Sequence, residues 1–239
     1  MTRLQELLAK ISDEDDVGDD RMAAFDQLND EATVEWLPEL RAAFAAAPDF
    51  VVREALAGPL ARLGGAKDLP LLLEGARRGE KEGHDNDSLQ AAICDVVEAD
   101  QAESFALLAK AAASGSPQQR KDAAWLLGFI DTPESFRLLE QLLRDSDPAV
   151  GAAAVPTIAG MKSGDGLGAI TSLPLPLRQA YRKLIEQAFR ENASLSPTPQ
   201  SREGKAGGFK ISTLVVWLLI VGAIVMLYLL SPPHHSGGK

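Results

Sequence analysis

VREALAGPLARLG, residues 52–64, is the stretch of sequence that decides the fold. Related segments follow as LQAAICDVVEAD (89–100), QRKDAAWLLGFID (119–131) and VGAAAVPTIAGM (150–161), with a weaker copy, DRMAAFDQLN, at 20–29. In register, the copies are spaced by 32, 37, 30 and 31 residues, measured between Arg21, Arg53, Gln90, Arg120 and Gly151. A period of this length is typical of helical repeat proteins.

A second set of apolar segments lies between these copies and predicts a partner helix for each. The segments are WLPELRAAF (36–44), DLPLLLEGA (68–76), ESFALLAKA (103–111) and ESFRLLEQL (134–142), with Leu40, Leu72, Leu107 and Leu138 in equivalent positions. Proline-containing turn signals mark the helix starts at Pro48-Asp49, Ser116-Pro117, Thr132-Pro133 and Asp147-Pro148. Such prolines are accepted in the first helical turn, where the backbone N–H has no intrahelical partner.

Small residues recur at one position of the repeat, and an aliphatic residue recurs at another. The small residues are Ala23, Ala55, Ala92 and Ala153, and Asp122 departs from this pattern; the aliphatic ones are Leu28, Leu60, Val97, Leu127 and Ile158. Helix pairs stack closely where small side chains let their axes approach, and a stack buries what one pair cannot. The sequence therefore predicts an all-α fold, a short right-handed α-solenoid of about five helix pairs.

The repeat resembles the HEAT-like repeats first described in phycobilisome lyases, in which Asp-Pro and Val-Arg precede an Ala-rich helix ending in Leu-Gly. The segments that carry the resemblance are SPQQRKDAAWLLGFID (116–131), DSDPAVGAAAVPTIAG (145–160) and VREALAGPLARLGG (52–65). It implies a protein-binding scaffold or, in a minority of that family, a chromophore lyase. Gln90 and Gly151 replace the repeat arginine, and Pro59 and Pro156 are expected to interrupt their helices, so we expect the last repeat to be irregular.

A run of about 20 uncharged residues, ISTLVVWLLIVGAIVMLYLL at 211–230, predicts a C-terminal transmembrane helix, because about 20 apolar residues span a bilayer core. The expected organisation is an N-terminal helix with an acidic turn (1–20), repeats (21–170), a capping helix (171–191), a flexible linker (192–210), the span (211–230) and a short tail (231–239). We expect no signal peptide in residues 1–11, which carry charges within an amphipathic pattern.

Charge is unevenly distributed along the chain, whose net charge is −10. Residues 1–50 carry 4 basic and 13 acidic side chains, and residues 151–239 carry 9 basic and 4 acidic ones. Arg202, Lys205 and Lys210 precede the apolar run and Lys239 follows it, which predicts a cytoplasmic N-terminal domain, at the inner membrane if the protein is bacterial. We expect no nucleic-acid partner, because no dense basic stripe is present.

Residues with catalytic or metal-binding chemistry are sparse. Cys94 is the one cysteine and falls at an alanine position of the repeat, so we interpret it as a buried apolar side chain. The three histidines include His84, expected to be solvated in a loop over 79–88, and they form no catalytic order with Ser or Cys. The acidic run at 13–20 lacks the glutamate that closes a calcium loop. We therefore predict no enzyme activity, cofactor, metal or small-molecule substrate.

Four residues are candidates for partner binding, because they are expected at outward positions of the second helix of each pair, which would line a concave face: Trp125, Lys121, Asp95 and Glu54. Trp125 either anchors a partner or folds back over its small neighbours and packs. The favoured function is a membrane-anchored protein–protein interaction scaffold or adaptor. The alternatives are a chaperone like the chromophore lyases, or a non-catalytic subunit of a membrane complex.

Overall fold

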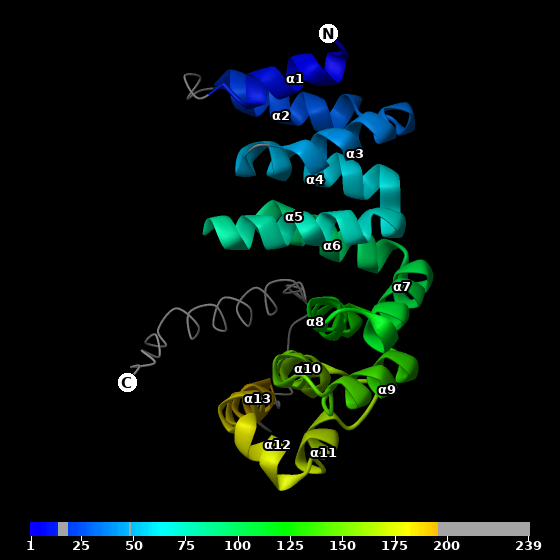
Figure 1. The fold of residues 1–239 in the computed structure, drawn as a ribbon, viewed down its shortest axis with the longest axis vertical. Helices are drawn as coiled ribbons and strands as arrows, with labels where there is room; N and C mark the ends of the chain where they lie inside the picture. Colours follow the sequence, from blue (N-terminus) through cyan, green and yellow to red (C-terminus); the bar gives the residue numbers. More distant parts are fainter. Residues whose placement is uncertain (14–18, 48, 196–239) are drawn as a thin grey trace, which may run out of the picture. The chain divides into compact units, whose positions relative to one another are not determined.

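The computed structural model describes residues 1–13, 19–47 and 49–195, and all regular elements within those ranges are helical. The chain divides into two compact units, residues 1–196 and 197–239, and the described helices lie in the first. The all-α class is confirmed for these residues. Their arrangement in successive helix pairs is consistent with an α-solenoid (Figure 1).

Five helix pairs follow one another in chain order. They are α1 (Arg3–Ile11) with α2 (Asp19–Glu31), α3 (Leu37–Ala46) with α4 (Phe50–Gly64), α5 (Leu69–Glu82) with α6 (Asp87–Ala99), α7 (Gln101–Ser114) with α8 (Pro117–Leu126), and α9 (Pro133–Leu142) with α10 (Pro148–Gly160). Short 3-10 turns η1 (Val34–Trp36), η2 (Gly65–Asp68) and η3 (Leu127–Phe129) adjoin α3, α4 and α8. The helices α11 (Gly166–Thr171), α12 (Leu175–Ala180) and α13 (Arg182–Leu195) follow.

Four helices begin at N-cap residues that belong to the turn signals predicted from the sequence. Asp49, Ser116, Thr132 and Asp147 are each an N-cap whose side-chain oxygen accepts a backbone N–H of the first turn. Ser116 also forms a capping box with Gln119. These side chains satisfy N–H groups that have no partner within the helix, so the predicted boundaries are confirmed there.

The aliphatic column of the repeat forms the core as predicted. Its five members are fully buried: Leu28, Leu60, Val97, Leu127 and Ile158. The register of the partner helices shifts by one residue between the third and fourth pairs, because Leu40 of α3 and Leu72 of α5 are buried, whereas Leu108 and Leu139 are the buried leucines nearest to this position in α7 and α9. The expected equivalence of Leu107 and Leu138 with Leu40 is therefore wrong; both are half-buried and pack on the core edge.

The two prolines inside second helices do not interrupt them. Pro59 lies within α4 and Pro156 within α10, and both helices continue past the proline. A proline removes one intrahelical hydrogen bond. The loss is tolerated here because each helix packs on neighbours along its length: α4 contacts α2, α3 and α6, and α10 contacts α8, α9 and α13. The expectation of broken helices at these positions was wrong.

The C-terminal part of the repeat unit is less regular than expected. In place of one helix over 171–191, the structure has the end of α11 followed by α12 and α13, and the LPLPL sequence at 173–177 marks the break. Tyr181, at the end of α12, is buried, whereas Phe189 on α13 is exposed. Most of the predicted linker and all of the span at 211–230 lie outside the described residues. No helix among the described residues is long and apolar enough to cross a membrane.

The second helices form a row with one discontinuity. The helix α4 packs on α2 and on α6, and α10 packs on α8 and on α13, but α6 and α8 have no comparable direct packing. The helix α7 packs on α8 and also contacts α6, and η3 at the end of α8 approaches α6. The direct packing between successive second helices is therefore interrupted between the third and fourth pairs.

Candidate functional site

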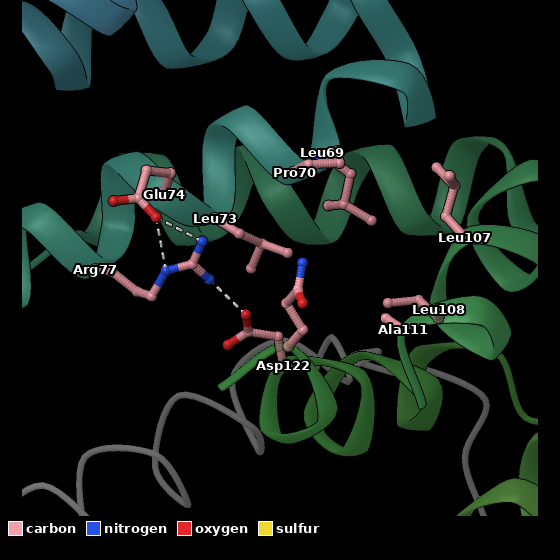
Figure 2. Close-up of a pocket in the computed structure, with 10 residues that line it drawn as sticks. Leu69, Pro70, Leu73, Glu74, Arg77, Leu107, Leu108, Ala111 and Asp122 are labelled. Atoms are coloured by element: carbon pink, nitrogen blue, oxygen red, sulfur yellow. Dashed lines mark hydrogen bonds and ion pairs between the residues drawn. The ribbon is translucent and has the colours of Figure 1, made fainter. Parts of the chain in front are cut away.

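A pocket of about 170 Å³ lies at this discontinuity, between α5, α7 and α8. One side is apolar and comes from two first helices; its lining residues are Leu69, Pro70, Leu73, Leu107, Leu108 and Ala111 (Figure 2). Leu69 and Leu108 are buried, whereas Leu73 and Leu107 are half-buried and form the solvent-accessible part of the apolar wall. The pocket thus offers an apolar surface that the helices themselves do not fill.

The other side of the pocket is polar and is organised by Arg77. Its Nη1 donates to Asp122 Oδ2 at 2.5 Å, and its Nε and Nη2 donate to Glu74 Oε2 at 3.1 and 2.8 Å (Figure 2). Gln118 Nε2 donates to the second oxygen of Asp122 at 2.9 Å. Both carboxylate oxygens of Asp122 therefore have donors, one of which comes from α5.

Asp122 is mostly buried, its side chain being 12% exposed. Burial raises the pKa of its carboxyl group above the ordinary value, although the hydrogen bond from Gln118 and the charges of Arg77 and Lys121 favour the ionised form. Desolvation disfavours a charged carboxylate, and neighbouring donors offset part of that cost. Burial and the neighbouring donors therefore act in opposite directions on the pKa of Asp122, and the effect of burial is the larger.

Glu54 does not face outward as expected. It is buried, and its carboxylate accepts the backbone N–H of Ser88 at 2.8 Å and of Leu89 at 3.3 Å. These groups belong to the first turn of α6, whose own N-cap residue, Asn86, makes no capping side-chain bond. Glu54 on α4 thus caps the second helix of the next pair, and its expected outward placement was wrong because α6 lacks a local cap.

Trp125 is half-buried and packs on the core, with an edge-on contact to Phe129 at a centroid distance of 6.1 Å. Its indole Nε1 is buried and has no hydrogen-bond partner among the described residues. An interface anchor usually keeps its polar atom accessible or paired. The geometry favours the second of the two alternatives for Trp125, in which it packs.

Lys121 is half-buried on α8, and Asp95 is exposed on α6. Neither residue lines the pocket, nor do Trp125 and Glu54. The structure therefore does not assemble the four candidates into the pocket. The site found instead depends on Arg77 and Asp122, and the sequence carried a signal for the second of these, since Asp122 departs from the small-residue column.

Other candidate residues lie where the sequence indicates. Cys94 is buried, and burial raises the pKa of its thiol to about 12, so it is inert at neutral pH. His84 is exposed, as expected, and its ring stacks on Phe50 at 4.5 Å. The helix α5 extends to Glu82, so the loop is shorter than the predicted 79–88.

Among the described residues, no group of three His, Cys, Asp or Glu side chains is placed to hold a metal ion.

Residues 104–173 match the family model of HEAT repeats. The matched stretch covers most of α7 and continues through α11, so it includes the α7 and α8 walls of the pocket. No curated protein and no solved structure matches the chain. The match and the paired-helix architecture together support a HEAT-like protein, and HEAT repeats generally mediate protein–protein interactions.

Proposed function

We propose that this protein is a membrane-anchored scaffold that binds a protein partner on the face formed by its second helices. The observation that carries the proposal is the HEAT-repeat match over residues 104–173, in a chain whose described helices form successive pairs. Stacked pairs present a continuous surface built from one helix of each pair, and repeat proteins use such surfaces to bind partners. Asp95 is exposed on one of these second helices, α6, and is therefore a suitable position at which to test partner binding.

The membrane anchor in this proposal is the uncharged run at 211–230, with the preceding stretch 192–210 as a tether. The basic residues Arg202, Lys205 and Lys210 lie on the repeat side of the run, which favours a cytoplasmic repeat unit. A scaffold held in this way keeps its partner close to the membrane surface. It needs no catalytic group, in keeping with the scarcity of histidine and cysteine.

The anchor is tested by alkaline extraction of membranes that contain the full-length chain. We expect the wild type to resist extraction and a Leu219→Arg, Val225→Arg variant to be released, because two arginines at the centre of a span are costly. The matched control places arginines at Ser201 and Gly207, outside the run. Release of the wild type, or retention of the Leu219→Arg, Val225→Arg variant, would refute the anchor.

Partner binding is tested by photo-crosslinking in the native membrane, with a photoreactive amino acid at one position of the full-length chain. Asp95, exposed on the second helix α6, is the test site, and Gln141, exposed on the first helix α9, is the control. We expect a discrete adduct from position 95 that is absent from position 141. A lack of adducts from position 95, or equal adducts from positions 95 and 141, would overturn binding on this face.

A further inference from the structure

The discontinuity in the row of second helices divides the repeat unit into two blocks. The first block is α1–α6, in which α2, α4 and α6 pack on one another in turn, and the second is α8–α13, in which α8, α10 and α13 do the same. Between the blocks, α6 and α8 lack direct packing of that kind, and α7 contacts both. The two blocks are therefore connected through α7 and the η3 turn.

An ion pair spans this junction where helix packing does not. Arg77 on α5 belongs to the first block and Asp122 on α8 to the second, 45 positions apart in sequence, and their side chains meet at 2.5 Å. Arg77 is 21% exposed and Asp122 is 12% exposed, so solvent screens the pair only partly. Figure 2 shows the pair closing one side of the pocket between the blocks.

The residue at position 122 is the exception in its column. The equivalent Ala55 and Ala92 are buried small side chains in α4 and α6. In α8 a carboxylate replaces the methyl group, although burial disfavours its charge. The ion pair gives α8 a direct connection to α5, in addition to the packing through α7 and η3, and an alanine at position 122 would not make that connection.

We propose that Arg77 and Asp122 form a latch that fixes the angle between α1–α6 and α8–α13, with α7 as the hinge. When the latch is open, the blocks move apart at the pocket and its apolar wall at Leu73 and Leu107 becomes more accessible. The latch thus controls the curvature of the surface formed by the second helices. This inference does not depend on the identity of a partner or on the membrane anchor.

The chain offers a matched control for the latch. Arg120 and Asp145 form an ion pair of similar exposure, 18% and 10%, but both residues belong to the second block. Because Arg120 also donates to Gly115 O at the end of α7, the pair is removed through Asp145→Asn, which weakens one block without freeing it from the other. Asp122→Ala also restores the residue found elsewhere in the column, so that variant is expected to fold.

The test is pulsed electron spin resonance on the full-length protein in detergent, in a Cys94→Ala background. Spin labels at Glu80→Cys and Gln141→Cys, both exposed, report the distance between blocks, and labels at Gln141→Cys and Lys183→Cys report a distance within the second block. We expect Arg77→Gln and Asp122→Ala each to broaden the distance distribution between blocks and shift it to longer values. The distribution within the block should stay unchanged.

Restoring the pair in reverse, with Arg77→Asp and Asp122→Arg together, should narrow the distribution again. Asp145→Asn should leave the distance between blocks unchanged while lowering the melting temperature. The latch is refuted if Asp122→Ala leaves the distance distribution between blocks as narrow as in the wild type, or if Asp145→Asn broadens it equally.

Discussion

Gly151 on α10 lies directly against Tyr181, so that a Cβ atom added at Gly151 would be 2.0 Å from Tyr181 Oη. Tyr181 is buried, and it occupies space that the longer repeat side chain at position 151 would need. The loss of the repeat arginine in the fifth pair is thereby explained: the chain that follows α10 folds back and fills the position with an aromatic ring. The expected irregularity of this repeat, the loss of its arginine, therefore results from the packing of Tyr181 against Gly151.

Gly151→Ala should lower the free energy of unfolding by about 1–3 kcal/mol, because the added methyl group overpacks against a rigid phenol. Tyr181→Phe in the same chain should recover part of that loss, since it removes the clashing oxygen. Gly160→Ala is the matched control in the same helix, because a Cβ there meets no atom within 4 Å. Urea unfolding of the wild type, Gly151→Ala, Tyr181→Phe and the double variant gives the coupling energy, and strict additivity of the two changes would contradict the contact.

Two carboxylates near α8 should give opposite pH dependences. The hydrogen bonds from Arg120 lower the pKa of Asp145 below its ordinary value of 3.8, so its stabilisation is present above that value and lost as pH falls through the folded-state pKa. Burial raises the pKa of Asp122, so its contribution grows more favourable as pH falls through its own folded-state pKa. Folding favours the protonated form of Asp122 and the ionised form of Asp145.

The measurement is the unfolding free energy of the wild type, Asp145→Asn and Asp122→Asn between pH 3 and 7. The difference between the wild type and Asp145→Asn should shrink toward acid pH. As pH falls, the unfolding free energy of the wild type should rise relative to that of Asp122→Asn. Parallel pH profiles for the two differences would show that the two sites do not titrate in opposite directions.

Glu54→Ala should destabilise the protein by about 1–2 kcal/mol, because it leaves the first-turn N–H groups of Ser88 and Leu89 without their acceptor. Hydrogen exchange should accelerate first at those amides. Asp95→Ala, at an exposed position on the same α6, is the control and should change stability by less than about 0.5 kcal/mol. Equal effects of the two changes would be inconsistent with a capping role.

Much of the fold could be predicted because its determinants are local or periodic. The N-caps at Ser116 and Asp147 and the buried aliphatic column are readable from residue type and spacing. Periodicity does not fix which face of a first helix is buried when the spacing between copies varies from 30 to 37 residues, and so Leu107 was aligned with Leu72 in place of the buried Leu108.

The candidate site was less predictable, because it depends on contacts between distant residues. Glu54 was assigned to an outward position from the repeat register alone, whereas its role depends on the start of α6, where Asn86 makes no capping bond. Arg77 shows no special feature in the sequence, and its partner lies 45 residues away. Asp122 did stand out as a departure from the alanine column, but an exception in a repeat does not reveal which residue it meets.

Trp125→Ala should cost about 3 kcal/mol of folding stability, the lower end of the range for removing a large aromatic side chain from a core, because the indole is only half-buried. Trp125→Phe is the discriminating control. It keeps an aromatic ring against Phe129 and removes an indole N–H that has no hydrogen-bond partner in the described part of the chain, so its cost should be small. Thermal melting of the full-length chain, combined with the crosslinking yield from position 95, separates packing from binding. If Trp125→Ala melted like the wild type but abolished the adduct, Trp125 would be a surface anchor for the partner; a large drop in melting temperature for the alanine variant and a small one for the phenylalanine variant would place its role in the core.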